Sequence, residues 1–140
     1  MTTDEVKSYL RQAYKLDKRL QRERRNLEKL KSTAEYHSPS FDGSGGNGNS
    51  DRIAESVSRI MEEEQRVHEL TDAYTAKYVE IEQTIKSIGD DALEEVLELR
   101  YLHNKSWEDI ANIMHYALRS VYEFHGQALQ KIAVNCIELQ

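Results

Sequence analysis

Two stretches of this chain repeat apolar residues at alternating steps of four and three, and this spacing strongly constrains the fold. The first stretch contains Tyr9, Ala13, Leu16, Leu20, Glu23, Leu27, Leu30 and Ala34. The second contains Ile53, Val57, Ile60, Glu64, Val67, Thr71, Tyr74, Tyr78, Ile81, Ile85 and Ile88. Sustained spacing of this kind is typical of a coiled-coil seam. The sequence therefore predicts two long helices, each with one apolar stripe.

A segment rich in glycine and serine at residues 38–50 separates the two stretches. Such a segment buries too little apolar surface to offset the entropy of ordering it, so we expect a flexible loop there. A loop between two long helices allows them to fold back on each other. We therefore predict an antiparallel helical hairpin over residues 4–88.

The hairpin register is set by placing Ala34 opposite Ile53, which pairs apolar residues along both seams. Glu23 and Glu64 then fall in one layer. Facing carboxylates repel, so one must take up a proton, turn outward, or meet an arginine or a second hairpin, and we favour the last two. Glu64 and His68 also share a helix face. However, carboxylate-bridged metal bundles use paired Glu-x-x-His motifs, which the chain lacks, so we expect no metal.

Composition agrees with long helices rather than one large core. The chain has 140 residues, of which 39% are hydrophobic and 31% charged, and it contains one proline. Cys136 is the single cysteine, which excludes an internal disulfide and agrees with a reducing cytoplasm. No apolar run reaches the ~18 residues of a membrane span, and no secretory signal is present, so we expect no membrane partner.

Charge is unevenly distributed along the chain. The net charge is +4 over residues 1–35, −7 over residues 36–91 and −3 over residues 92–140, which sums to −6. This total argues against a general nucleic-acid coat. The basic first arm offers a second DNA contact, but we favour a solvated helix face that pairs with the acidic arm.

The C-terminal third, over residues 91–135, carries signals for shorter helices. Gly89 ends the second long helix and an aspartate starts the next one. Ser106 caps a short helix, with Asp109 in a shortened capping box. The buried side of that helix comprises Ile110, Ala111, Ile113 and Met114. We expect Trp107 to anchor this helix against the hairpin.

A turn at His115, Tyr116 and Ala117 follows, and then a last helix with one apolar face. That face comprises Val121, Phe124, Ala128, Leu129 and Ile132. This layout is that of a helix-turn-helix, which places its last helix in a DNA major groove. The alternative is a set of amphipathic helices packed for stability alone.

The segment from Leu97 to Ile132 resembles region 4 of bacterial sigma factors. The matching parts are Leu99-Arg100-Tyr101, Ser106-Trp107-Glu108-Asp109-Ile110-Ala111, Val121 and Ala128-Leu129-Gln130-Lys131-Ile132. The form with Tyr122 and His125-Gly126 is closest to phage late-gene activators of the RinA and ArpU type. The resemblance covers about 45 of the 140 residues. It implies a phage or prophage transcription regulator that binds double-stranded DNA in the bacterial host cytoplasm and contacts RNA polymerase.

The sequence departs from the family pattern at the start of the last helix. Ala117 replaces the usual Ser or Thr cap, which costs about 1 kcal/mol of helix stability. Glu123 stands where relatives carry a basic residue. Because phosphate neutralisation dominates DNA affinity, a single acidic module should bind weakly, and we expect a homodimer or a shift towards binding protein.

The candidate DNA-binding residues lie on the outer face of the last helix, and the candidate phosphate contacts flank them. The former are Leu118, Arg119, Ser120, Tyr122, Glu123, His125 and Gln127, and the latter are Lys105, Ser106 and Lys131. The chain has no phosphate loop, zinc pattern or dinucleotide turn. We therefore expect no enzyme activity, catalytic residue or cofactor.

The sequence therefore predicts an all-α protein with a coiled-coil hairpin followed by a small helix-turn-helix domain, acting as a transcription regulator. Two alternatives stay open. The acidic module could bind protein, such as RNA polymerase or a host defence factor. The chain could instead be a phage DNA-packaging subunit, because small terminase proteins also pair a helix-turn-helix with a coiled coil.

Overall fold

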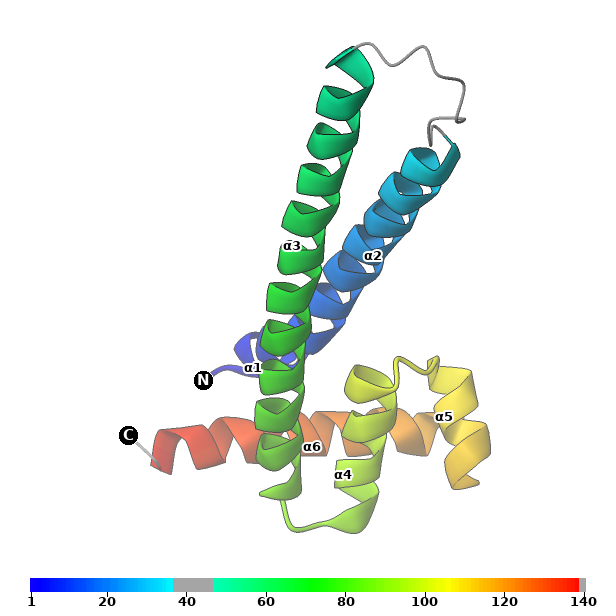
Figure 1. The fold of residues 1–140 in the computed structure, drawn as a ribbon. Helices are drawn as coiled ribbons and strands as arrows, with labels where there is room; N and C mark the ends of the chain where they lie inside the picture. Colours follow the sequence, from blue (N-terminus) through cyan, green and yellow to red (C-terminus); the bar gives the residue numbers. More distant parts are fainter. Residues whose placement is uncertain (37–46, 139–140) are drawn as a thin grey trace. The chain divides into compact units, whose positions relative to one another are not determined.

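The computed structural model describes residues 1–36 and 47–138, and over these residues the fold is all-α, as the sequence predicts. The elements are α1 (Thr3–Leu10), α2 (Gln12–Tyr36), α3 (Asn47–Lys86), α4 (Asp91–Leu97), the π-helix η1 (Glu98–Leu102), α5 (Trp107–Met114) and α6 (Leu118–Glu138) (Figure 1). The chain divides into two compact units. Unit 1 contains Met1–Leu16 and Tyr74–Gln140, and unit 2 contains Asp17–Ala73.

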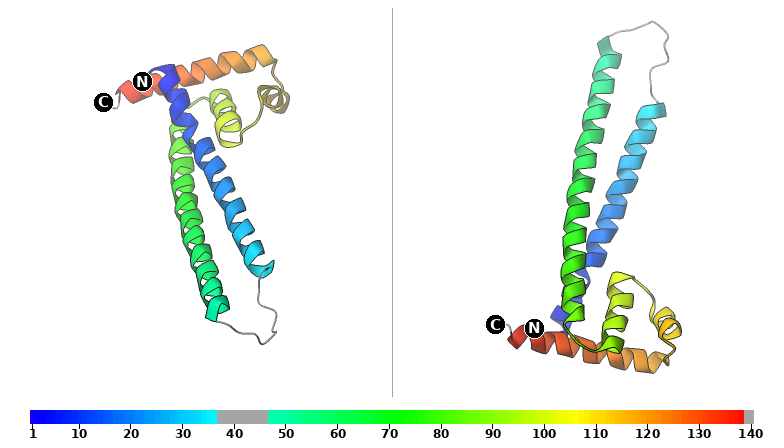
Figure 2. Two further views of the ribbon diagram at one scale, coloured as in Figure 1. Left: turned by 90° about the horizontal axis from the view of Figure 1, so that it is seen from above. Right: turned by 60° about the horizontal axis from the view of Figure 1, so that its bottom comes forward.

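Unit 1 holds most of the buried apolar side chains. In it α6 packs against α1, α4 and α5 (Figure 2). The larger core cluster comprises Val6, Leu10, Ala13, Ile81, Ile85, Ile88, Leu93, Leu97, Tyr101, Leu102, Ala128, Leu129, Ile132 and Ala133. Tyr9 packs against this cluster and its hydroxyl group bonds with Glu80 and Thr84 at 3.1 and 3.2 Å. The core of unit 1 therefore joins both ends of the sequence.

Local signals set the helix ends in unit 1. Thr2 accepts a hydrogen bond from the backbone N–H of Glu5 and so caps α1. Gly89 has φ +78°, a left-handed conformation that glycine adopts at little cost, and it ends α3. Asp90 then caps α4 by accepting from Leu93 N–H at 3.2 Å. The break between the second long helix and the next one lies where the sequence predicts it.

The Leu99-Arg100-Tyr101 motif forms a π-helix instead of continuing the preceding α-helix. The N–H of His103 donates to the carbonyl oxygen of Glu98 at 2.9 Å, five residues back. Short π-helical turns occur often at functional sites. Here the turn lies among side chains of both core clusters, since Leu99, Tyr101 and Leu102 are all buried.

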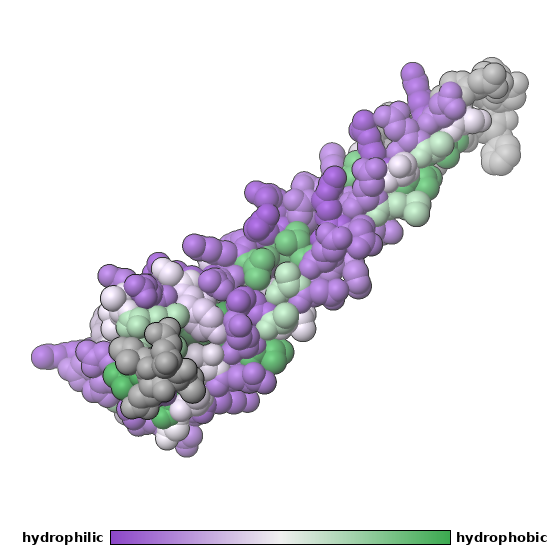
Figure 3. Space-filling model, turned by 90° about the vertical axis from the view of Figure 1, so that its left-hand side faces the viewer, coloured by the Kyte–Doolittle hydropathy of each residue, from purple (hydrophilic) through white to green (hydrophobic). Residues whose placement is uncertain are grey.

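In unit 2 the α2 and α3 segments lie side by side and run antiparallel (Figure 1). Lys31 on α2 pairs with Glu64 on α3 at 3.3 Å. Leu20 and Glu63 are the buried residues of this unit within the described part of the chain. The seam residues Ile53 and Val57 are 44% and 49% exposed, contrary to the predicted apolar seam. Figure 3 shows apolar patches along the otherwise polar surface of this unit.

The acidic layer of the hairpin contains Glu63 instead of Glu64, which corrects the predicted register. Glu63 is 3% exposed and pairs with Arg66 at 2.7 Å, whereas Glu64 points outward to Lys31. A hydrogen bond between the Glu23 and Glu63 carboxyl groups raises the pKa of Glu63, with burial adding to the effect, and lowers that of Glu23. Apart from the Glu23 carboxyl group, Oε1 of Glu63 meets no hydrogen-bond partner among the described residues. Of the two carboxyl groups, Glu63 is therefore the one that takes up a proton more readily.

Two helix boundaries also differ from the predictions. The predicted loop at 38–50 lies mostly outside the described residues, but residues 47–50 belong to the first turn of α3. A glycine costs least near the end of a helix, where backbone groups lack partners in any case. The first predicted helix is interrupted at Arg11, whose backbone N–H bonds to the carbonyl oxygens of Lys7 and Tyr9.

Within the described ranges no helix is long and apolar enough to cross a membrane.

Candidate nucleic-acid interface

Residues 106–138 form two helices joined by a short turn. Ser106 accepts a hydrogen bond from Asp109 N–H at 3.2 Å, so the predicted cap of α5 is formed. His115 ends α5 in the left-handed conformation, with φ 60° and ψ 39°, and its N–H bonds back to the carbonyl of Ala111. The turn then leads into α6 at Leu118. The helix, turn and helix lie where the sequence predicts them.

A second core cluster packs against the buried faces of these two helices. It comprises Val96, Leu99, Ile110, Ala111 and Val121, with Trp107, Met114 and Phe124 packed against it. Ala111 is 9% exposed, as expected for a small residue where two helices cross closely. The first turn of α6 therefore rests on an apolar base, and its opposite face is open to solvent.

The outer face of α6 presents several of the predicted contact residues. Arg119 has a side chain that is 92% exposed, and its Nε lies 3.6 Å from Oε1 of Glu123. Tyr122 is 47% exposed. These three lie at helical spacings of three and four, so they form one ridge. Leu118 and Gln127 are also exposed and Ser120 is half-buried.

His125 is buried, which corrects its prediction as a DNA-facing residue. Its side chain lies in the aromatic layer between η1 and α5, with Tyr101 stacked at 5.8 Å between centroids and Trp107 edge-on at 4.7 Å. The Tyr101 hydroxyl group bonds with His125 Nε2 at 2.7 Å. His125 follows Val121 by four residues and precedes Ala128 by three, which places it on the core face. The spacing of apolar residues in the sequence therefore already indicates that His125 is buried.

Burial first, and then the positive charges of Lys7, Arg100 and Arg11, together lower the pKa of His125 to about 4. Its imidazole is therefore neutral at pH 7. The pKa of Tyr101 is raised by burial, which outweighs the opposite effect of Arg11 and Arg100. Neutral forms of both side chains suit a hydrogen bond that lies inside an apolar layer.

Trp107 packs within the helix-turn-helix, against the second core cluster, and not against the hairpin as predicted. The Arg100 guanidinium stacks over its ring at 4.4 Å, and the Tyr122 ring lies 5.2 Å away. Arg100 also donates to the carbonyl oxygen of Lys105 at 3.1 Å. The sequence predicts Arg100 only as part of the Leu99-Arg100-Tyr101 motif, and its stacking on Trp107 was not predicted, although the aromatic residues that follow it along the chain are a signal for such stacking.

The predicted phosphate contacts are separated in the structure. Lys105 and Ser106 lie in the exposed loop before α5, where the Ser106 hydroxyl group is engaged in the cap. Lys131 is exposed on α6, but it follows Arg119 by twelve residues, or about 18 Å along a helix. Lys105 and Ser106 therefore form one group, and Lys131 stands apart near the far end of α6.

The described residues contain no cluster of three or more His, Cys, Asp or Glu side chains that could hold a metal ion. Cys136 is half-buried against the larger core.

Comparisons of the chain with protein-family models, with curated proteins and with solved structures find no match.

Proposed function

We propose that this protein is a sequence-specific DNA-binding transcription regulator, in which the start of α6 enters the major groove. One observation carries the proposal: a capped helix, a tight turn and a second helix rest on a common core and leave Arg119, Tyr122 and Gln127 exposed. The N-terminal residues of the second helix make the base contacts in proteins of this kind. The resemblance to sigma region 4 and to phage late-gene activators supports the same role and suggests contact with RNA polymerase.

The proposal includes a homodimer held by the helical hairpin. Ile53, Val57 and Met61 repeat every four residues on α3 and are 44%, 49% and 64% exposed. A second hairpin would cover this stripe, and two modules would supply two half-sites to offset weak phosphate neutralisation. Light scattering should give the mass of a dimer. Ring-sized oligomers would favour a DNA-packaging subunit instead.

A second candidate function is protein binding through the same face. Ile113, Tyr116, Leu118 and Tyr122 are 36–47% exposed around the turn of the motif. Aromatic and aliphatic side chains of this kind are common at the centres of protein interfaces. The ion pair between Arg119 and Glu123 also reduces the positive charge available to a phosphate. An RNA polymerase surface or a host defence protein is the proposed partner in this case.

A salt titration of duplex binding separates the two candidates. Fluorescence anisotropy of a labelled duplex pool should show binding at low salt that weakens as salt rises. Arg119→Ala should reduce the salt slope by about one, the loss of one phosphate contact. Lys86→Ala, which removes an exposed cation of α3 paired with Glu82, is the matched control and should leave the slope unchanged. If no duplex binds even at low salt, the regulator proposal is wrong.

A further inference from the structure

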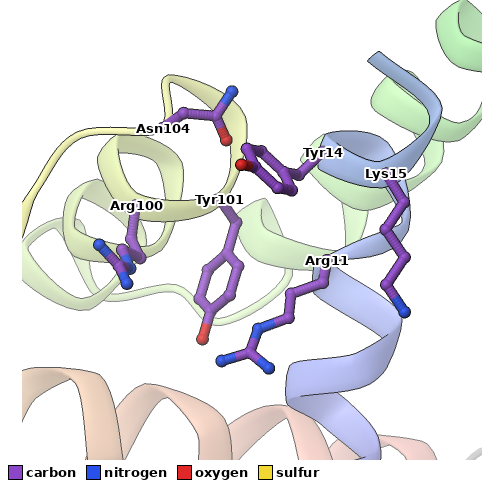
Figure 4. Close-up of a pocket in the computed structure, with 6 residues that line it drawn as sticks. All are labelled: Arg11, Tyr14, Lys15, Arg100, Tyr101 and Asn104. Carbon is purple, nitrogen blue, oxygen red and sulfur yellow. The ribbon is translucent and has the colours of Figure 1, made fainter. Parts of the chain in front are cut away.

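Unit 1 contains a cavity of about 450 Å³ that the proposed DNA interface does not use (Figure 4). Its lining combines three cations, two phenol rings and one amide, namely Arg11, Lys15, Arg100, Tyr14, Tyr101 and Asn104. None of these residues is acidic. A volume between about 300 and 1,000 Å³ is typical of pockets that bind small ligands. The cavity therefore has the size and the charge of a site for an anion.

The positive charge of the cavity is not neutralised locally. Arg11 and Lys15 are exposed and take part in none of the ion pairs of the described residues. Arg100 bonds to a backbone carbonyl oxygen and stacks on Trp107, neither of which removes its charge. The pKa of His125, behind the cavity wall, is lowered first by burial and then by cations that include Arg100 and Arg11. An anion in the cavity would lie near three cations that form no ion pair with an acidic side chain of the described residues.

Tyr14, which is 40% exposed, adds flat apolar surface to this charge, and the buried Tyr101 forms part of the wall. Figure 4 shows Tyr14 and Tyr101 reaching the cavity from different elements, with the Arg11 side chain extending towards the Tyr101 hydroxyl group. Asn104 lies beside Tyr14 and has a left-handed backbone, φ 57°, that sharply turns the loop here. Phenol rings stack on nucleobases, and arginine matches the geometry of a phosphate group. The pocket therefore presents groups that bind a phosphate next to a side chain that packs against a planar ring.

We propose that this pocket binds a phosphorylated ligand of nucleotide size. Arg11 and Lys15 contact the phosphate oxygens, Arg100 contributes its field, and the exposed ring of Tyr14 packs against the planar ring, while Tyr101 stays in the pocket wall. A free nucleotide and a backbone phosphate with its adjoining base share this chemistry. The experiment therefore needs one arm for each source.

The pocket wall is connected to the candidate interface, and this connection supplies a readout. Tyr101 bonds to His125 on α6, and Arg100 stacks on Trp107, the single tryptophan of the chain. A ligand that contacts Tyr101 or draws Arg100 towards a phosphate changes the surroundings of the indole ring. Trp107 fluorescence should therefore report occupancy without any label.

The first arm titrates the full chain with ADP and follows Trp107 fluorescence and binding heat. We expect ADP to bind, inorganic pyrophosphate to bind more weakly and adenosine not to bind. Arg11→Gln and Lys15→Gln, both at exposed positions, should each weaken ADP binding at least about tenfold. Arg59→Gln is the matched control, because it removes an exposed arginine of unit 2 that pairs with Glu55. Circular dichroism checks that each variant is folded.

The second arm measures the salt dependence of duplex binding for Arg11→Gln. ADP binding that needs Arg11 supports a free ligand. No ADP binding, together with a salt slope reduced by about one in Arg11→Gln, supports a backbone phosphate. The proposal is overturned if Arg11→Gln changes neither measurement, or if adenosine binds as tightly as ADP. The first arm requires no DNA, so its outcome is independent of the proposed regulator function.

Discussion

The hydroxyl group of Tyr101 lies 2.7 Å from Nε2 of His125 and joins the π-helix to the middle of α6. Both residues are buried, at 5% and 9% exposure, so water does not replace this bond if it is lost. The contact fixes α6 against η1 just below the exposed ridge of Arg119, Tyr122 and Glu123. It therefore holds the candidate interface in place without belonging to it.

Tyr101→Phe should destabilise unit 1 by about 1–3 kcal/mol, because it leaves the buried imidazole of His125 without its partner. Urea unfolding followed by far-ultraviolet circular dichroism measures the change. Tyr116→Phe is the matched control, since Tyr116 is 46% exposed and its ring contact with Phe124 does not need the hydroxyl group. Equal effects of the two substitutions would contradict the structural role of the Tyr101 bond.

The stability of unit 1 should fall as pH is lowered from about 6.5 towards 4. His125 has its pKa lowered to about 4 by burial, so between these values the unfolded chain binds a proton that the folded chain does not. At about 1.4 kcal/mol per pKa unit, the loss approaches about 3 kcal/mol. Urea unfolding of wild type and His125→Gln at both pH values isolates the effect, because the variant should lack it. An NMR titration that gives His125 an ordinary pKa would contradict this account.

In unit 2 the expected pH dependence has the opposite sign. Glu63 has a raised pKa, so its contribution to stability is present below the ordinary pKa of glutamate and is lost as pH rises through the folded value. The lowered pKa of Glu23 acts in the more acidic range, where stability is lost as pH falls. Glu63→Gln keeps a hydrogen-bond donor beside Glu23 but cannot ionise. It should slow amide exchange around Leu20 at pH 8 and change it less at pH 4, below the ordinary pKa of glutamate.

If exchange around Leu20 is the same in Glu63→Gln and wild type at both pH values, the pKa of Glu63 is not raised by its contact with Glu23. Glu64→Gln serves as the control. Glu64 has a 49% exposed side chain and a partner in Lys31, so this substitution should have a small effect at either pH.

The two helix starts of the motif should respond to substitution in opposite directions. Ser106→Ala removes the hydroxyl group that accepts from Asp109 N–H and should cost about 1 kcal/mol of stability. Ala117→Ser supplies a cap at the start of α6, where alanine has none to offer, and should add about the same amount. Thermal unfolding of both variants checks the pair. A neutral Ala117→Ser would mean that this helix end is already satisfied in another way.

Local chemistry made the C-terminal motif predictable from the sequence. The signals that end or begin a helix depend on residues no more than four or five positions away. Each of them lies at the helix end that it predicts, namely Ser106, Gly89 and the turn at His115. The apolar face of α6 was predictable for the same reason, since Val121, Leu129 and Ile132 repeat at helical spacing and are buried. All-α architecture follows from these patterns.

The prediction that His125 faces DNA rested on its polar character, but its position on the helix determines its burial. A histidine between Val121 and Ala128 on a helix lies on the buried face, and a neutral imidazole with one partner is tolerated there. The register error in the hairpin has another cause. Glu62, Glu63 and Glu64 are consecutive and chemically alike, so only the drift of a real helix relative to a strict heptad repeat decides which one turns inward.

The π-helix and the basic cavity had no local signal in the sequence. The N–H of His103 bonds five residues back in η1 because the side chains around it pack that way in three dimensions. The cavity combines Arg11, Tyr14 and Lys15 with Arg100, Tyr101 and Asn104, which are separated by about 90 positions. Only the folded core of unit 1 brings these two groups together.

A selection from a random duplex library with the purified chain tests the central claim most directly. If the start of α6 reads the major groove, the wild-type protein should enrich one sequence motif, and Gln127→Ala or Tyr122→Ala should relax it at defined positions at a cost of about 1–3 kcal/mol per base contact. Glu108→Gln, on the exposed side of α5, should leave the motif unchanged. Failure of the wild-type protein to enrich any motif at low salt would contradict the account.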